Sequence, residues 1–437
     1  MNTQFDLVIT GGNVIDPHLG LLSHASIFVK DGKFLNIETN KATIAASIKT
    51  LARDRVIDAT GMLVTPGLID MHVHLREPGR EDEETILTGA MAAAAGVFTA
   101  ICCMPTTHPA LDNQESVRFI ASQAQSAAAR VYVVGAITKD IAGKELAEIG
   151  DLVKAGVVAI SDDGNYLQNP DLMRRALEYA RMFDIPILQH AEDQFLVGGG
   201  VMNEGWESTR LGISGRPGVA EEVAVLRDIQ LAGFTGGRVH IQHVSAAGSV
   251  EAIRRAKAEG VRITAEACPH HFTLTDSEIG KRFDTNLKVN PPLRTQKDID
   301  AIIGGLVDGT IDCITTDHAP HSHEEKDVEF DQAPSGMIGL ETALGLVKTR
   351  LVDKGFLSWP DAIRKMTVAP ARILKLPHGD FTAGRAADVT IIDPDRTWTV
   401  RPESFHSRSR NTPFGGWELS GSVVKTIKGG VVRYQAP

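Results

Sequence analysis

The feature that most constrains the fold is a regular alternation of short apolar runs with helical segments between residue 66 and about residue 375. The apolar runs have the length of buried strands, and residues 171–182 and 219–231 carry apolar side chains three and four positions apart. About eight strand–helix units in succession are typical of a parallel (β/α)₈ barrel. We therefore predict an α/β fold with a TIM-type barrel over residues 66–375.

The two ends of the chain have a different pattern from the barrel. Residues 1–65 contain short strand-like runs separated by turn signals such as Asp31-Gly32. The strand-like pattern returns after residue 376, in residues 387–393, 423–427 and 431–434. We predict that residues 1–65 and 376–437 together form one small β-sandwich domain.

Composition and charge indicate the class of partner. The formal net charge of −10 over 437 residues argues against nucleic acid or an anionic membrane as the main partner. The N-terminus lacks a cationic segment followed by an apolar run, and no uninterrupted apolar stretch of about 18 residues occurs. We therefore expect a cytoplasmic protein that acts on a small molecule. The four cysteines lie in apolar runs and are expected to be buried thiols.

Two histidines near the start of the predicted barrel are the first candidate metal ligands. Residues 68–75 alternate apolar and polar side chains, so the imidazoles of His72 and His74 would point to the same side of a strand. Zinc and its neighbours favour imidazole and carboxylate ligands. An isolated pair of this kind is weak evidence, because two histidines on one strand face often form only a polar surface. Other strand ends must supply further ligands.

Four more predicted strands end in side chains that suit a metal. Barrel enzymes place their chemistry at the carboxyl ends of the strands, so these side chains would meet His72 and His74 on one rim. One such residue alone is more often a loop cap, but five strand ends of this kind are hard to explain as independent caps. The additional residues are Asp162, Asp163, His190, His243 and Asp317.

This set of residues points to the hydrolysis or closure of a cyclic amide. It can hold two divalent cations with a bridging carboxylate and a shared hydroxide as nucleophile. Asp317 would remain to move protons to and from the leaving nitrogen.

Several sequence strings carry a family resemblance. They are residues 67–79, Asp162-Asp163-Gly164, His190-Ala191-Glu192, His243-Val244-Ser245, Pro269-His270-His271, residues 288–294, residues 316–321 and Asn411-Thr412-Pro413-Phe414. Together they closely resemble the bacterial type I dihydroorotases of the amidohydrolase superfamily. The resemblance implies an enzyme that reversibly cyclises N-carbamoyl-L-aspartate to L-dihydroorotate in pyrimidine synthesis, with zinc, two ions per subunit, as its cofactor.

The resemblance also implies a role for each metal ligand. His72, His74 and Asp317 would bind the more buried metal, and His190 and His243 would bind the second. Asp163 would bridge the two metals, where many superfamily members use a carboxylated lysine. Asp162 is the competing candidate for the bridge, because the sequence does not show which of the two carboxylates turns inward; the family motif favours Asp163.

The residues expected to bind the substrate carboxylates come from the same resemblance. Arg76 would take a carboxylate in two parallel hydrogen bonds, with a surface salt bridge as the alternative. Asn290 and His321 would complete the contact. One position departs from the family, which usually has asparagine where this chain has Thr106. A threonine hydroxyl cannot present the donor and acceptor pair of an amide, so this departure bears on the substrate and the rate and leaves the metal ligands unchanged.

Two other functions stay open at this stage. Thr106 leaves room for another cyclic-amide hydrolase, of the hydantoinase, dihydropyrimidinase or allantoinase type. A noncatalytic dihydroorotase-like partner of aspartate transcarbamoylase is the alternative from a different class, although such subunits tend to lose metal ligands. A homodimer and an association with aspartate transcarbamoylase are also left open. The polar segment 322–332 is interpreted either as a solvated charge run or as a mobile lid.

Overall fold

The centre of the fold is a sheet of eight parallel strands. The computed structural model describes residues 5–17, 20–22, 25–49 and 51–437. Neighbouring strands of the sheet follow one another in chain order. The strands are β8 (Leu68–Val73), β9 (Phe98–Cys103), β10 (Arg130–Ala136), β11 (Ala159–Ser161), β12 (Ile187–Gln189), β15 (Val239–Ile241), β16 (Ile263–Ala267) and β17 (Cys313–Ile314).

The sheet is nearly closed into a barrel. A parallel bridge joins Val73, at the end of the first strand, to His318, which follows the last strand. The backbone N–H of His74 donates to the carbonyl oxygen of His318 at 2.8 Å. The predicted TIM-type barrel is therefore confirmed, and its first and last strand ends lie next to each other.

Helices connect the barrel strands, as the alternating sequence pattern predicts. α5 shows why one of them forms where it does, because the Asn169 side chain accepts from the first backbone N–H groups and Pro170 occupies the first turn. The helices are α2 (Ile86–Ala95), α3 (Gln114–Gln123), α4 (Ile149–Ala155), α5 (Pro170–Phe183), α8 (Gly218–Thr235), α9 (Ala247–Ala258), α11 (Gln296–Asp308), α14 (Trp359–Lys365) and α15 (Val368–Leu374). The predicted helices at 171–182 and 219–231 lie within α5 and α8.

Shorter elements decorate the loops of the barrel. They are α6 (Gln194–Val197), β13 (Met202–Asn203), α7 (Trp206–Leu211), β14 (Gly215–Arg216), α10 (Ile279–Arg282), α12 (His323–Lys326) and α13 (Ala343–Val347).

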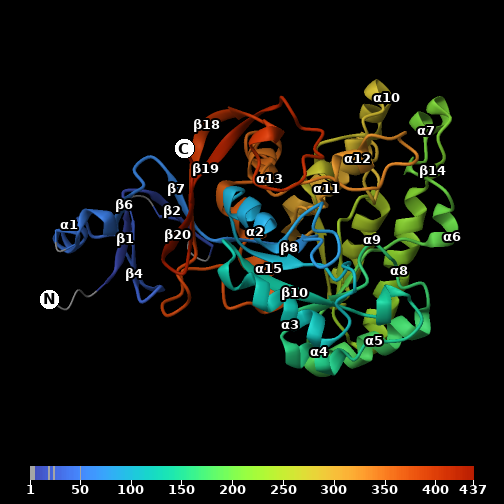
Figure 1. The fold of residues 1–437 in the computed structure, drawn as a ribbon, viewed down its shortest axis with the longest axis horizontal. Helices are drawn as coiled ribbons and strands as arrows, with labels where there is room; N and C mark the ends of the chain where they lie inside the picture. Colours follow the sequence, from blue (N-terminus) through green and yellow to red (C-terminus); the bar gives the residue numbers. More distant parts are fainter. Residues whose placement is uncertain (1–4, 18–19, 23–24, 50) are drawn as a thin grey trace.

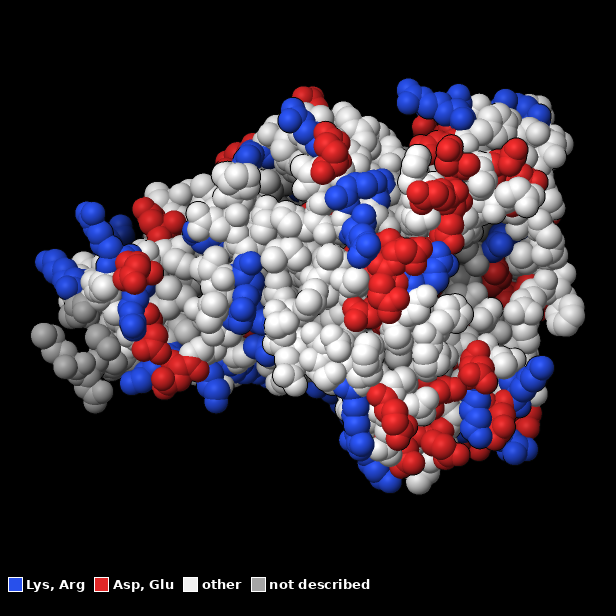
Figure 2. All heavy atoms as spheres, viewed as in Figure 1, with Lys and Arg blue, Asp and Glu red and all other residues white. Residues whose placement is uncertain are grey.

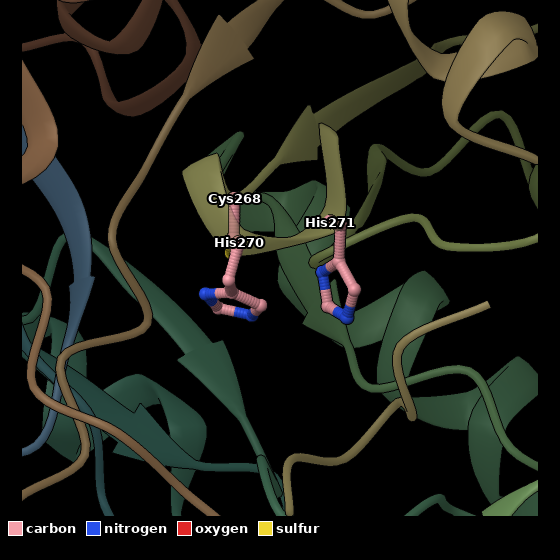
Figure 3. A group of neighbouring side chains, drawn as sticks. All are labelled: Cys268, His270 and His271. Carbon is pink, nitrogen blue, oxygen red and sulfur yellow. The ribbon is translucent and has the colours of Figure 1, made fainter. Parts of the chain in front are cut away.

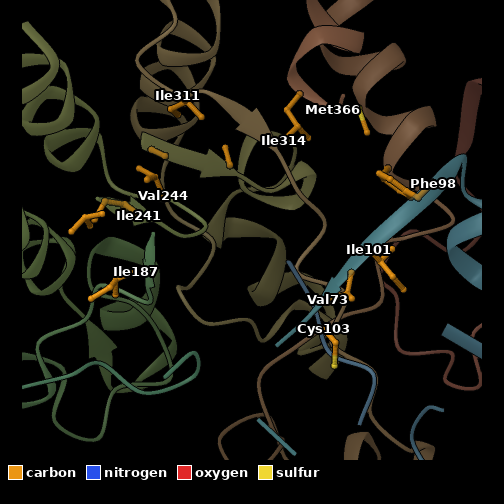
Figure 4. Close-up of a cluster of buried hydrophobic side chains, with 14 of the residues drawn as sticks. Val73, Phe98, Ile101, Cys103, Ile187, Ile241, Val244, Ile311, Ile314 and Met366 are labelled. Carbon is orange, nitrogen blue, oxygen red and sulfur yellow. The ribbon is translucent and has the colours of Figure 1, made fainter. Parts of the chain in front are cut away.

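Apolar side chains fill both sides of the barrel strands. Phe98, Ile101 and Cys103 of β9 pack in the large core that includes residues of the surrounding helices (Figure 4). Ala100 and Cys102 of the same strand belong to a separate cluster with residues of other strands. Because both of its faces are buried, β9 is a largely apolar run rather than a half-polar one.

Strands from both chain ends form a β-sandwich beside the barrel, as the sequence predicts (Figure 1). β7 from the N-terminal part pairs with β18 from the C-terminal part, so one sheet contains strands of both ends. We propose residues 1–65 and 376–437 as this domain and residues 66–375 as the barrel. One sheet contains β5 (Lys33–Glu38), β4 (Ser26–Lys30), β1 (Leu7–Thr10) and β6 (Val56–Asp58); the other contains β20 (Val431–Gln435), β19 (Glu418–Lys428), β18 (Val389–Thr399), β7 (Leu63–Pro66), β2 (Asn13–Asp16) and β3 (Gly20–Leu22).

Two local features differ from the sequence prediction. Helix α1 (Lys41–Ile48) lies within the N-terminal part, where only strands and turns were expected, and the Asn40 side chain caps it. The apolar run before Asp317 extends over residues 313–316, but the strand within it ends at Ile314. It ends early because the backbone N–H and the hydroxyl of Thr316 both donate to the buried Asp70 carboxylate.

The surface shows no dominant charge on the face drawn in Figure 2, where acidic and basic side chains are interspersed. In the part of the chain that the structure describes, no helix is both long and apolar enough to cross a membrane.

We predict that Phe98→Ala destabilises the barrel strongly, whereas Phe195→Ala does not. Phe98 is fully buried, so its removal leaves a cavity and should lower the free energy of unfolding by about 3–5 kcal/mol. The Phe195 side chain is 89% exposed, and its loss should change stability by no more than about 0.5 kcal/mol. Urea denaturation followed by circular dichroism measures both. Equal effects of the two substitutions would contradict the assignment of this core.

Candidate metal centre

Five strand ends of the barrel bring the six predicted metal ligands to one rim. His72 lies on β8 and His74 directly follows it, while the other residues follow β11, β12, β15 and β17. All six side chains are buried: His72, His74, Asp163, His190, His243 and Asp317.

The first group of ligand atoms surrounds the two histidines of β8. Nε2 of His72 lies 3.3 Å from Asp163 Oδ2 and 3.4 Å from Asp317 Oδ1. Nε2 of His74 lies 3.1 Å from the same Asp163 oxygen and 3.3 Å from the same Asp317 oxygen. Two imidazole nitrogens and two carboxylate oxygens therefore face one another.

The second group meets at the other oxygen of Asp163. His243 Nε2 lies 3.6 Å and His190 Nδ1 3.8 Å from Asp163 Oδ1. The two imidazole nitrogens are 2.8 Å apart. Asp163 thus presents one oxygen to each group of imidazoles.

The structure separates the two adjacent carboxylates that the sequence left as alternatives. The Asp162 side chain turns away from the histidines and accepts from the backbone N–H groups of Ile137 and Thr138 at 2.8 and 3.0 Å. Asp163 turns toward them. Asp162 therefore holds the neighbouring loop, and Asp163 is the carboxylate that lies among the imidazoles.

The surroundings keep the carboxylates of the centre ionised. Burial raises the pKa of Asp163. The charge of His72 and the hydrogen bonds of the surrounding imidazoles outweigh this effect and hold the pKa of Asp163 well below its usual range. The same balance, with His72 and His74 as the main opposing groups, lowers the pKa of Asp317. Carboxylate oxygens and imidazole nitrogens are the donor set that divalent cations of the zinc type accept.

A buried glutamate that sequence reasoning missed supports His72 from behind. Oε1 of Glu266 lies 2.6 Å from His72 Nδ1, and Oε2 lies 3.0 Å from His240 Nε2. Despite full burial, the charges and hydrogen bonds of these two histidines lower the pKa of Glu266 to about 2. The sequence does contain a sign of this role, because Glu266 is an acidic residue within the mostly apolar strand β16. A charge that is buried in this way requires a partner.

Thr106 lies against a metal-ligand candidate. Its hydroxyl oxygen is 3.1 Å from Nδ1 of His74, on the opposite side of the ring from Asp163 and Asp317. The sequence did not indicate this contact to His74. The substrate contact of Thr106 stays a prediction.

Arg76 and His321 form a second cluster beside the ligands. Nη2 of Arg76 lies 3.4 Å from Nε2 of His321, and Nε of Arg76 lies 3.0 Å from a carboxylate oxygen of Glu83. The Arg76 side chain is only 14% exposed, so its salt bridge to Glu83 is mostly buried rather than on the surface. Glu83 was also missed, because it lies in an acidic run that looks solvent-exposed in the sequence.

The polar segment 322–332 is attached to this cluster rather than being only a solvated charge run. Glu325 accepts from Arg80 at 2.6 Å and lies 3.2 Å from Nδ1 of His321. The buried Lys326 donates to the carbonyl oxygens of Thr285 and Pro334 at 3.1 and 2.8 Å.

Asn290 approaches the second group of ligands. Its Nδ2 lies 3.1 Å from Nε2 of His190 and 3.2 Å from an oxygen of Glu192. Its Oδ1 is buried without a hydrogen-bond partner. Thr106 and Asn290 therefore contact the ligand candidates His74 and His190, whereas Arg76 and His321 contact each other and Glu83.

Three residues of the centre have unusual backbone conformations. Arg76, His243 and Asp317 have positive φ angles of 60°, 32° and 48°. L-residues adopt this region only when the surrounding structure compensates its cost, and such residues concentrate at functional sites.

The residues present fit a metal centre. Asp163 Oδ1 is buried without a hydrogen-bond partner, and groups of three ligand atoms from the six side chains lie within 4.8 Å of one another. Ligand atoms that converge in this way would compensate the burial of the Asp163 charge by binding a cation.

Comparison with known proteins decides the family. A family model described as dihydro-orotase-like matches residues 61–249. The dihydroorotase of Pelotomaculum thermopropionicum is 54% identical over 429 residues, which cover 98% of each chain. The dihydroorotase of Syntrophotalea carbinolica is 51% identical, over 98% of this chain and 99% of its own. The chain belongs to the dihydroorotase family.

Solved structures of cyclic-amide hydrolases share the fold of this dihydroorotase-family protein. The L-hydantoinase (dihydropyrimidinase) from Arthrobacter aurescens has a TM-score of 0.87 at 25% identity, covering 98% of this chain and 96% of its own. The dihydropyrimidinase from Brevibacillus agri has a TM-score of 0.83 at 22% identity, covering 98% and 94%. This likeness supports the barrel and sandwich architecture.

We predict that Asp163→Asn and Asp162→Asn have opposite effects on metal binding and stability. Asp163→Asn should lose most bound metal, because the first group loses one of its two anionic oxygens and the second group loses the one that it has. Asp162→Asn should keep its metal but lower the free energy of unfolding by about 1–3 kcal/mol, because buried N–H groups lose an ionised acceptor. Elemental analysis after dialysis and urea denaturation measure the two effects. Full metal content in Asp163→Asn would contradict this assignment.

Proposed function

We propose that this protein is a zinc-dependent dihydroorotase of the bacterial type I branch. It would catalyse the reversible closure of N-carbamoyl-L-aspartate to L-dihydroorotate and water. The near-complete coverage by dihydroorotases at 48–54% identity is the observation that carries this proposal. Asp163 at the bridging position, in place of a lysine, supports the type I assignment.

The two groups of ligand atoms support a two-metal arrangement. His72, His74 and Asp317 would hold the more buried ion, and His190 and His243 the other. Asp163 would contact both, one with each oxygen. When bound, such cations polarise the ring carbonyl and make water a nucleophile near neutral pH.

Asp317 is placed to move the proton in this reaction. In the hydrolytic direction, its carboxylate would accept a proton from the attacking water and deliver it to the departing ring nitrogen as the amide C–N bond breaks. Oδ1 of Asp317 lies 3.4 Å from Nε2 of His72 and 3.3 Å from Nε2 of His74, which places it beside the proposed metal ligands. In the synthetic direction the same proton returns to water.

Arg76 and His321 would recognise the substrate carboxylate. Both side chains are mostly buried, and they contact each other. Arg76 also has a favourable charge interaction with Asp317. The planar guanidinium can present two parallel donors to a carboxylate. Asn290, whose buried Oδ1 lacks a partner, would bind the substrate from the side of His190.

These contacts favour dihydroorotase over the two alternatives. Dihydrouracil and hydantoin lack the carboxylate that a buried arginine would bind. A noncatalytic subunit would not need six converging ligands, and this chain keeps all of them buried on one rim. A homodimer, an association with aspartate transcarbamoylase and a cytoplasmic location stay predictions from the sequence.

The decisive experiment compares L-dihydroorotate with dihydrouracil, which is the same ring without the carboxylate. We expect kcat/KM for L-dihydroorotate to be higher by at least about 100-fold, because only this substrate carries the carboxylate that Arg76 and His321 would bind. Hydantoin and allantoin complete the panel. A preference for any of the three uncharged rings would contradict the proposal, and no turnover by metal-loaded protein would favour the noncatalytic alternative. In Arg76→Ala the preference should shrink while bound zinc is unchanged.

We predict that Asp317→Asn lowers turnover of L-dihydroorotate by about 10²- to 10⁴-fold, because the amide cannot accept the proton. Bound zinc is measured in the same sample, so that loss of the ion is distinguished from loss of the base. Near-normal turnover with zinc bound would rule out this role of Asp317.

We predict that the Thr106 hydroxyl fixes the tautomer of His74. With Nε2 directed to the metal, Nδ1–H would donate to Thr106 Oγ1. Thr106→Val removes this acceptor and should weaken zinc binding by about 10- to 100-fold, whereas Thr106→Ser should restore it. Competition with a chromophoric chelator measures the affinity. Thr107→Val is the matched control, because the Thr107 hydroxyl donates to the Pro109 carbonyl oxygen instead of contacting His74. An equal effect there would exclude a specific role for Thr106.

A further inference from the structure

A second group of potential ligands lies outside the six residues already described. Cys268 directly follows β16, and His270 and His271 lie on the single 3₁₀ turn (Pro269–Phe272) that comes next. All three side chains are buried. One ligand atom of each lies within 4.8 Å of the others. Figure 3 shows the two imidazole rings side by side, extending from the same turn.

The hydrogen bonds of His271 leave one of its nitrogens available as a ligand. Nε2 lies 2.9 Å from the carbonyl oxygen of Pro291, so it must carry the proton that it donates. Nδ1 is then an unprotonated acceptor, and it is buried without any hydrogen-bond partner. Metal-binding histidines commonly show this arrangement, in which the second nitrogen donates to a carbonyl or carboxylate and orients the ring.

His270 adds a second nitrogen of the same kind. Its Nε2 is also buried without a partner, and its ring centroid lies 4.2 Å from that of His271. Buried polar atoms are normally paired, so two unpaired imidazole nitrogens beside a thiol require an explanation. A bound cation would account for both at once.

We propose that Cys268, His270 and His271 form a further metal site for Zn²⁺, distinct from the centre around Asp163. One sulfur and two imidazole nitrogens select a thiophilic cation, and a fourth position would remain for water. Binding releases the thiol proton of Cys268 to solvent, and the resulting thiolate forms the bond to the metal. The proposal does not depend on the proposed reaction, because none of its residues belongs to the catalytic machinery.

Cobalt substitution tests this site, because it would be the only one of the proposed metal sites with a sulfur ligand. Metal-free full-length protein is titrated with Co²⁺ alone, and a thiolate-to-cobalt charge-transfer band should appear in the near ultraviolet. Cys268→Ser should lose the band and bind about one Co²⁺ fewer per chain. Cys103→Ser is the matched control, since Cys103 is a buried thiol of β9 whose sulfur donates to the carbonyl oxygen of Met104 and which belongs to none of the proposed metal sites. It should keep both the band and the stoichiometry.

Three results would overturn the proposal. The first is saturation of the wild-type protein with Co²⁺ without a thiolate band. The second is a band that survives Cys268→Ser. The third is a band lost in Cys313→Ser but not in Cys268→Ser, which would assign it to the group of His240, Glu266 and Cys313.

A second measurement needs no variant and therefore stays valid if Cys268→Ser fails to fold. X-ray absorption of the wild-type protein loaded with Zn²⁺ should show a sulfur neighbour at about 2.3 Å, beside the nitrogen and oxygen neighbours. Absence of any sulfur neighbour at full zinc loading would reject the site. Turnover of L-dihydroorotate by the same sample tests the proposed function separately.

Discussion

The buried carboxylate of Asp163 is the group on which the rest of the site depends. Its two oxygens face different pairs of imidazoles, His72 with His74 and His190 with His243. A buried charge is costly unless opposite charge or hydrogen bonds surround it, so each of these rings must be held at a particular place. The barrel meets this requirement because the carboxyl ends of its parallel strands lie on one rim.

The barrel also holds the ligands from behind. The carboxylate of Glu266, on β16, contacts both His72 and His240. The hydroxyl of Thr106 contacts Nδ1 of His74. The bridge between Val73 and His318 brings the first and last strand ends together, which places Asp317 beside the two histidines. Such contacts fix ring orientation and tautomer, on which metal affinity depends.

In this superfamily the barrel architecture does not by itself determine which substrate is bound. Hydantoinases and dihydropyrimidinases share the architecture at 22–25% identity, so the barrel alone does not select the ring that is opened. Selection would lie in the loops, where Arg76 contacts His321 and both approach Glu83. Backbone strain at Arg76, His243 and Asp317 is consistent with loops that are shaped for binding.

The sequence by itself determined the barrel, the shared sandwich and the strand ends that carry the ligands, because apolar period and strand–helix alternation are local properties. It could not decide between Asp162 and Asp163, since that depends on the N–H groups of Ile137 and Thr138 on a neighbouring strand end. Nor could it reveal Glu83 as buried, or pair Thr106 with His74, because these contacts join segments that only the folded barrel brings together. Tertiary structure decided them because burial and hydrogen bonding depend on distance in space rather than on separation along the chain.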